Sequence, residues 1–243
     1  LTEDTLELTD MINPRVVDLL RDQKKAFTPV TIALGKGAAV ITGANMGGKS
    51  VAMKTVALNV ALLQAGFLVC AEEAKMPLFH SVQMLFDDLQ SIQSGLSGFG
   101  SEIVQFQKAL GEVEQGYALF LLDEFARGTN PDEGAAIVQA VTAYLNKKHA
   151  VTLLATHYAN VSDRANAHYQ VIGLKELDLD ALRKELAGRA DDVGVELISR
   201  HMNYGLYRVE DAQDCPRDAV NICRLLDMKA EILQEIDGIL ADQ

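Results

Sequence analysis

The sequence predicts an α/β fold with a sheet flanked by helices and a C-terminal helical segment. Two predominantly apolar runs, residues 117–122 and 150–155, favour this class, because strands buried on both faces of a parallel sheet are hydrophobic along most of their length. Between them and before them lie stretches with apolar residues at helical spacing, such as residues 102–114. Strands that alternate with helices are typical of a sheet covered on both faces.

The composition narrows the range of functions. Of the 243 residues, 49% are hydrophobic, which is enough for a buried core. The net charge of −12 argues against a broad DNA-binding surface, because such surfaces depend on Lys and Arg. The three cysteines, Cys70, Cys215 and Cys223, lack C-x-x-C spacing and are typical of reduced thiols. Without a signal-peptide pattern or a run of 18 apolar residues, we expect a cytoplasmic protein that does not contact membranes.

A glycine-rich turn joins a predicted strand, residues 38–41, to a predicted helix, residues 49–64. Residues 43–50 read Gly-Ala-Asn-Met-Gly-Gly-Lys-Ser and fit the G-x-x-x-x-G-K-[ST] phosphate loop, or Walker A motif, in its strand–turn–helix context. Backbone N–H groups of such a loop surround phosphate oxygens, and the helix N-terminus adds partial positive charge. We therefore expect nucleotide binding by Gly43, Asn45, Met46, Gly47, Gly48, Lys49 and Ser50.

An acidic pair, Asp123 and Glu124, closes the apolar run at residues 117–122. The carboxyl ends of parallel strands are where ligands bind in open α/β sheets. Lys49 is expected to reach the β- and γ-phosphates of ATP, whereas Ser50 and Asp123 hold Mg²⁺. Glu124 is expected to polarise the attacking water. The alternative for the pair is a solvated strand end.

Two further segments leave alternatives open. The glycine- and serine-rich stretch at residues 94–101 is either a flexible linker or a second phosphate contact at a helix start. His157 follows the strand at residues 150–155, where a polar side chain either senses the γ-phosphate or has a structural role.

The chain is expected to divide into an ATPase domain, residues 1–174, and a C-terminal extension, residues 175–243. Further strands are predicted at residues 5–9, 27–34, 67–70, 82–86 and 170–174, and a short helix is predicted from Pro14. The extension is predicted to contain a hairpin around residues 203–205, a helix from Pro216 and a last helix capped by Asp227. The last helix carries an apolar stripe that suits dimerisation, formed by Ile232, Leu233, Ile236, Ile239 and Leu240.

Several motifs occur together in one order that resembles the MutS family of DNA mismatch-repair ATPases. The matching pieces are residues 42–50 (Thr-Gly-Ala-Asn-Met-Gly-Gly-Lys-Ser), 96–99 (Leu-Ser-Gly-Phe), 122–124 (Leu-Asp-Glu), 127–129 (Arg-Gly-Thr) and 155–158 (Ala-Thr-His-Tyr). The likeness covers roughly residues 25–170 well. It implies a P-loop NTPase sheet of the ATP-binding-cassette-like type and Mg-dependent ATP hydrolysis, with Lys49, Glu124 and His157 as catalytic residues.

The resemblance also implies roles for four residues elsewhere in the chain. Ser97 matches the signature serine that reaches the γ-phosphate of the partner subunit's ATP, and His157 matches the switch histidine. Phe27 lies where an aromatic ring stacks on adenine. Gln90 belongs to a stretch, residues 88–91, that resembles the loop reporting nucleotide state. The family works as a dimer with two shared ATP sites, so we expect a homodimer.

The partner of this ATPase is left open by the sequence. No counterpart of the family's mismatch-reading or clamp domains is present, so any contact with DNA is expected through parts outside this chain. Residues 130–134 (Asn-Pro-Asp-Glu-Gly) are similar to MutS-related ATPases that reactivate cobalamin-dependent aminomutases, which makes a protein client the alternative. A nucleotide-binding scaffold with little turnover is a third hypothesis, which the intact Lys49, Asp123, Glu124 and His157 count against.

Overall fold

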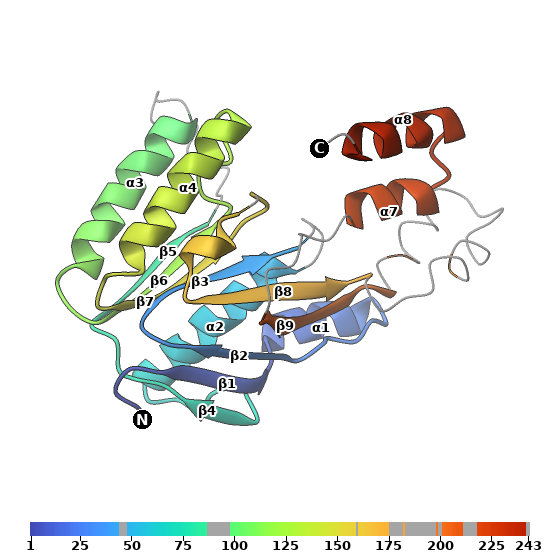
Figure 1. Ribbon diagram of the computed structural model, residues 1–243. Coiled ribbons are helices and arrows are strands. Elements are labelled where there is room, and N and C mark those ends of the chain that lie inside the picture. The colour runs from blue at the N-terminus through green and yellow to red at the C-terminus, as the bar shows by residue number, and fades with distance from the viewer. Residues whose placement is uncertain are drawn as a thin grey trace.

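A six-stranded sheet in the order β5-β6-β7-β3-β8-β9 forms the centre of the protein (Figure 1). All neighbouring strands are parallel except β8 and β9, which are antiparallel. In sheet order the strands are β5 (Ser81–Leu85), β6 (Ala118–Asp123), β7 (Ala150–Ala155), β3 (Gly37–Thr42), β8 (Ala167–Gly173) and β9 (Asn203–Val209). The mixed α/β class with a mostly parallel sheet is therefore confirmed.

The computed structural model describes residues 1–43, 48–86, 98–158, 160–174, 182, 198, 201–210 and 218–241.

A second, three-stranded sheet in the order β2-β1-β4 is antiparallel. Its strands are β1 (Leu6–Met11), β2 (Val30–Leu34) and β4 (Glu73–Lys75). The α-helices within the described ranges are α1 (Pro14–Asp22), α2 (Lys49–Gln64), α3 (Gly98–Val113), α4 (Pro131–Leu145), α7 (Asp218–Leu225) and α8 (Ala230–Ala241).

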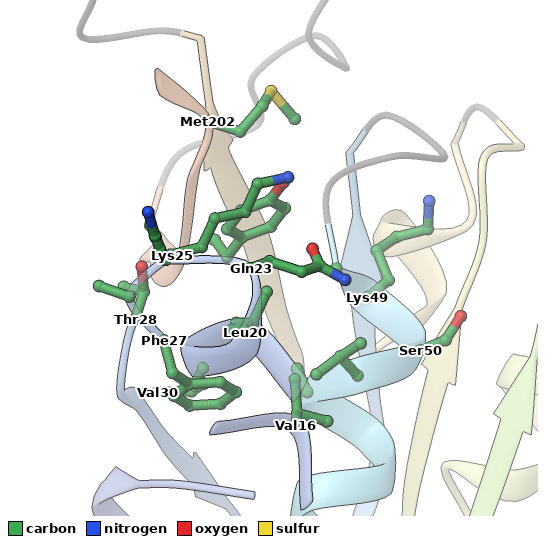
Figure 2. A pocket seen from close by; sticks show the side chains of 16 residues that line it. Val16, Leu20, Gln23, Lys25, Phe27, Thr28, Val30, Lys49, Ser50 and Met202 are labelled. Atoms are coloured by element: carbon green, nitrogen blue, oxygen red, sulfur yellow. The ribbon is translucent and has the colours of Figure 1, made fainter. Parts of the chain in front are cut away.

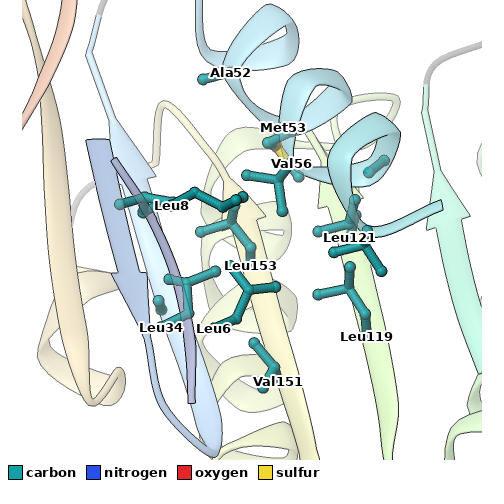
Figure 3. Close-up of a cluster of buried hydrophobic side chains, with 14 of the residues drawn as sticks. Leu6, Leu8, Leu34, Ala52, Met53, Val56, Leu119, Leu121, Val151 and Leu153 are labelled. Atoms are coloured by element: carbon teal, nitrogen blue, oxygen red, sulfur yellow. The ribbon is translucent and has the colours of Figure 1, made fainter. Parts of the chain in front are cut away.

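Each face of the central sheet has its own hydrophobic core. On one face, Met53 and Val56 of α2 pack against Leu121 and Leu153, and β1 closes the cluster through residues such as Leu8 (Figure 3). On the opposite face, α3 and α4 lie together (Figure 1), and their apolar residues pack on the other side of the same strands. Every residue of β3, β6 and β7 is buried, as expected for strands covered on both faces.

The strand register brings polar residues to one edge of the sheet. Asp123, the last residue of β6, lies opposite Ala155, the last residue of β7, and Ala155 in turn lies opposite Ile41 of β3. Parallel strands end at the same edge, so the segments that follow β3, β6 and β7 converge there. These segments carry the glycine turn, the acidic pair and His157 respectively.

Helix ends follow from local capping. The Asn13 side chain accepts a hydrogen bond from the Val16 N–H at the start of α1, and Pro14 occupies the first turn. Helix α4 begins at Pro131, because the Asn130 side chain caps it in the same way. Helix α2 begins at Lys49, as predicted.

Two predicted features are wrong, and one strand was not predicted. Residues 67–70 form no strand, and Phe67 and Leu68 are 66% and 93% exposed, because this short apolar run finds no strand partner after α2. Nearby, residues 73–75 form β4, a strand that was not predicted and that pairs with β1. The predicted hairpin turn at residues 203–205 lies inside β9, whose partner is β8.

The C-terminal helices α7 and α8 are connected by a short ion pair between Arg224 and Asp237. Helix α8 begins at Ala230, so Asp227 is not its N-cap. Ile232 and Ile239 of the predicted apolar stripe are exposed. The expected domain division at residues 174 and 175 stays a prediction. No helix among the residues described is long and apolar enough to cross a membrane.

Candidate functional site

The glycine turn between β3 and α2 is described at its two ends, Gly43 and Gly48. Both glycines have positive φ, 130° at Gly43 and 82° at Gly48, a region that side chains with a Cβ disfavour. Neighbouring side chains also leave little space for a Cβ at either glycine. A Cβ at Gly43 would lie 3.0 Å from Val171 Cβ, and a Cβ at Gly48 would lie 3.0 Å from Tyr204 Cδ1. Glycine is therefore required at both ends for backbone conformation and for space.

Lys49, the first residue of α2, is only 3% exposed. Its ammonium group donates a 2.8 Å hydrogen bond to the Gly43 carbonyl, which connects the two ends of the glycine turn. The same Nζ lies 3.7 Å from Glu124 Oε1. A buried charge is stable only with such partners, so the fold holds a cation beside the glycine turn.

Asp123 and Ser50 meet at the carboxyl end of β6. The Ser50 hydroxyl donates a hydrogen bond to the Asp123 carboxylate. Burial raises the pKa of Asp123, an effect that this hydrogen bond and the charge of Lys49 oppose. Asp123 Oδ1 is buried and finds no hydrogen-bond partner among the residues that the structure describes. A carboxylate oxygen with a free acceptor position beside a hydroxyl is a donor set that suits Mg²⁺.

Glu124 follows directly, in a turn that bends sharply away from the strand. Its φ is 50°, and Ala126 has a φ of 62°, conformations that cost non-glycine residues roughly 1–2 kcal/mol each. The Glu124 carboxylate contacts Lys49 through Oε1 and Arg127 through Oε2, at 2.9 Å in the second case. Contacts with two cations therefore hold both carboxylate oxygens in place, as a general base or water-positioning group needs.

A cavity of about 710 Å³ opens beside the start of α2 (Figure 2). Its volume lies within the usual range of ligand pockets, about 300–1,000 Å³. Phe27 and Lys49 lie on opposite sides of the lining, and Ser50 follows Lys49 (Figure 2). The structure thus brings the predicted aromatic residue and the predicted phosphate-binding residues to one cavity.

Other residues that line the cavity were not predicted from the sequence. They include Val16 and Leu20 of α1, Met202 just before β9 and Tyr204 within β9. The α1 residues carry an ordinary amphipathic pattern, which does not reveal a ligand contact. Met202 and Tyr204 lie about 150 residues after the glycine turn in the chain, and only the pairing of β9 with β8 brings them there.

His157 is exposed at the same edge of the sheet, after β7. Its ring is tilted against that of Tyr158, with 4.5 Å between centroids. The Tyr158 side chain instead points inward and donates a hydrogen bond to the Ala126 carbonyl at 2.9 Å. The position of His157 fits either a γ-phosphate sensor or a surface residue, so its role stays a prediction.

Several predicted site residues lie outside the described part of the chain. They are Asn45, Met46 and Gly47 of the glycine turn, Gln90, and Ser97. Their expected contacts with the nucleotide or with a partner subunit therefore stay predictions. The residues that the structure brings together are Gly43, Gly48, Lys49, Ser50, Asp123 and Glu124, with Phe27 across the cavity.

Comparison with known proteins agrees with these motifs. Residues 39–227 match the family described as MutS domain V. An endonuclease MutS2 of Symbiobacterium thermophilum is 36% identical over 179 residues, 72% of this chain and 22% of the relative. Endonuclease MutS2 proteins of Geobacillus kaustophilus and Halothermothrix orenii are each 38% identical, over 68% and 64% of this chain and 21% and 20% of their own lengths.

The chain thus spans about a fifth of the length of these relatives. The part that matches MutS domain V, residues 39–227, contains the glycine turn, the acidic pair and His157. The match to MutS domain V covers more than half of the chain. The protein therefore belongs to the MutS family, through the nucleotide-binding ATPase domain of that family.

Proposed function

We propose that this chain is a P-loop ATPase module that binds ATP with Mg²⁺ and hydrolyses it to drive the closure of a dimer. The observation that carries the proposal is the cavity that extends from Phe27 to Lys49 and Ser50. An aromatic ring at one side and a helix N-terminus with a buried lysine at the other match the two ends of a nucleotide.

Binding follows from the chemistry of the two sides. At the phosphate side, Lys49 supplies a point charge, and the N-terminus of α2 adds backbone N–H groups. At the base side, the Phe27 ring provides a flat apolar surface on which adenine stacks. Ser50 and Asp123 would hold Mg²⁺, which neutralises phosphate charge when bound.

Glu124 is the group proposed to orient the attacking water and accept its proton. Its carboxylate is held by Lys49 and Arg127 in the structure. Triphosphate oxygens offer Lys49 a stronger partner than a single carboxylate, so nucleotide binding would weaken the contact of Lys49 with Glu124. Glu124 would then act on water, while Arg127 still fixes one of its oxygens. His157, at the end of β7, is proposed to respond to the γ-phosphate.

The proposed assembly is a homodimer with two ATP sites shared between the subunits. Ser97 of one subunit would contact the ATP of the other, and the loop that contains Gln90 would report the nucleotide state. The relatives named endonuclease MutS2 favour a DNA-processing role for a longer protein that carries this module. They give no support to the aminomutase alternative. DNA contact is proposed only through parts outside this chain.

Binding of a fluorescent ATP analogue to the Lys49→Ala variant tests the proposal. We expect the loss of tight nucleotide binding, because the phosphates lose the one lysine charge at the helix start. Lys54→Ala is the matched control, since Lys54 is an exposed lysine on the same helix. Unchanged affinity in Lys49→Ala, or an equal loss in both variants, would contradict the phosphate-binding role.

A further inference from the structure

The turn that contains Glu124 is held in place by residues from other parts of the chain. This Glu124 turn, residues 124–127, has left-handed backbone at Glu124 and at Ala126, neither of which is glycine. Such conformations persist only where the surrounding structure fixes them, and they gather at active sites. The residues that impose the conformation therefore bear on the reaction.

Side chains from two other elements bind the backbone of Ala126. Glu102 of α3 accepts a 3.1 Å hydrogen bond from the Ala126 N–H through Oε1. Tyr158, after β7, donates a 2.9 Å hydrogen bond from its hydroxyl to the Ala126 carbonyl. Both polar backbone atoms of the left-handed residue are thus held by side chains that are distant in sequence.

The rest of the Glu124 turn is anchored to the same elements. Phe125 is buried and packs against Phe106 of α3, with 4.9 Å between ring centroids. The backbone N–H of Glu124 donates a 2.9 Å hydrogen bond to the Ala155 carbonyl of β7. Helix α3 and the end of β7 therefore hold the turn from two sides.

Space for the Tyr158 hydroxyl is provided by a glycine in the first turns of α4. A Cβ added at Gly134 would lie 2.2 Å from the Tyr158 hydroxyl oxygen and 3.1 Å from the Ala126 carbonyl oxygen. Only glycine at residue 134 leaves both atoms in place. This close packing shows that the hydroxyl has a defined position against the turn.

We propose that Glu102 and Tyr158 are positioning residues that hold Ala126 in its left-handed conformation and thereby direct the Glu124 carboxylate toward the bound nucleotide. This inference rests on the proposed function, in which Glu124 acts on the attacking water. Glu124 lies two residues before Ala126, so a change in the backbone of Ala126 alters the direction of the carboxylate. Neither Glu102 nor Tyr158 is proposed to touch the nucleotide.

Steady-state ATP hydrolysis by single variants tests the proposal. Glu102→Ala is expected to lower kcat about tenfold or more, a part of the 10²–10⁴-fold that a positioned general base contributes. Its KM for ATP and its nucleotide affinity are expected to stay within about twofold, because the cavity is untouched. Tyr158→Phe, which removes only the hydroxyl, should behave in the same way. Circular dichroism and Tm verify that each variant is folded.

Two controls separate positioning from a general loss of structure. Glu102→Gln keeps an amide oxygen that can accept from the Ala126 N–H, so it should retain most of the wild-type kcat. Glu112→Ala removes a carboxylate from the same helix, about 15 Å further along at 1.5 Å per residue, and should leave kcat unchanged. Equal losses in Glu102→Ala and Glu102→Gln, or a KM that rises as kcat falls, would overturn the hydrogen-bond role.

The double variant Glu102→Ala/Tyr158→Phe provides the closing measurement. Both contacts act on one residue, so the combined loss in kcat should be clearly smaller than the product of the single losses. Losses that multiply would overturn a shared action on Ala126. Glu124→Gln is measured alongside. If it stops hydrolysis while Glu102→Ala and Tyr158→Phe hydrolyse normally, the positioning role fails and the proposed function stands. If Glu124→Gln hydrolyses normally, the catalytic role of Glu124 and the positioning role fail together.

Discussion

Lys49 Nζ lies 3.7 Å from Glu124 Oε1, and both side chains are almost entirely shielded from solvent. Lys49 is also tied to the Gly43 carbonyl, and Glu124 to Arg127. The contact joins the start of α2 to the turn after β6, two elements that lie far apart in the sequence. It places the proposed phosphate-binding charge directly beside the proposed catalytic carboxylate.

Glu124→Gln is expected to bind ATP normally and to hydrolyse it slowly, by roughly two orders of magnitude or more, as for the loss of a general base. The amide can still accept a hydrogen bond from Arg127, so the turn should keep its shape. Single-turnover hydrolysis, together with nucleotide affinity, measures the two effects separately. Near-normal turnover would move the catalytic role to another residue.

Phe27→Ala is expected to weaken the binding of ATP by about 5- to 150-fold, because base–aromatic stacking contributes about 1–3 kcal/mol. Phe27 lines the cavity on the side away from Lys49 (Figure 2). Competition by ATP and by inorganic triphosphate against a fluorescent nucleotide checks the assignment. Affinity for triphosphate should not change, and Phe27→Tyr should bind ATP as the wild type does. An equal loss for both ligands would show that Phe27 supports the fold instead of the base.

The central strands could be predicted because nearly all of their residues are apolar and polar residues follow directly after the apolar run. The runs at residues 117–122 and 150–155 coincide closely with β6 and β7. The same criterion failed at residues 67–70, where Phe67 and Leu68 face solvent, since a short apolar run does not specify a partner. Strand β4 was missed for the opposite reason. Its three residues are exposed and two of them are charged, and only pairing with β1 makes it a strand.

Some residues of the candidate site could be predicted from the sequence and others could not. Lys49, Ser50, Asp123 and Glu124 could be predicted because each lies at a fixed spacing within one local motif. Tyr158 and Glu102 could not, because their role depends on the conformation of Ala126, which the sequence does not reveal. A left-handed alanine arises from tertiary contacts, whereas a left-handed glycine, as at Gly48, is signalled by the residue itself.

The stability of the fold should fall at mildly acidic pH through His168 in β8. Burial lowers the pKa of His168 below its ordinary value of 6.5, and its Nε2 lies 2.7 Å from the Thr42 hydroxyl oxygen at the end of β3. The unfolded chain then binds the proton more tightly than the folded one. The contribution of neutral His168 to the free energy of unfolding is complete above about pH 6.5. It is lost as the pH falls toward the lowered pKa that His168 has in the folded protein.

His168→Gln is expected to make the stability less dependent on pH, because the amide can still form a hydrogen bond with Thr42 and does not titrate. Tm measured from about pH 5 to pH 8 for both proteins checks it, over the range in which histidine changes charge. The wild type should lose more of its Tm on the acidic side than His168→Gln does. Parallel curves would mean that other groups cause any acid sensitivity.

Association of two subunits is expected to depend on the bound nucleotide. Glu124→Gln with Mg-ATP is expected to form a dimer, because slow hydrolysis traps the state in which two subunits share their nucleotides. Ser97, outside the described residues, is proposed to contact the partner's ATP in a two-fold arrangement. Ser97→Arg in the Glu124→Gln background should weaken this dimer through charge and bulk, while the circular dichroism spectrum stays unchanged.

A second variant separates this closed form from association through α8. Ile239 is 59% exposed on that helix, so Ile239→Glu would disrupt contacts between C-terminal helices without reaching the nucleotide. Sedimentation velocity of Glu124→Gln, alone and combined with each change, with and without Mg-ATP, distinguishes the two surfaces. Dimer content that rises with ATP and falls with Ser97→Arg supports shared sites. The opposite outcome is a dimer content that changes neither with nucleotide nor with Ser97→Arg but falls with Ile239→Glu. It would mean that α8 alone joins the subunits and that each site hydrolyses ATP by itself.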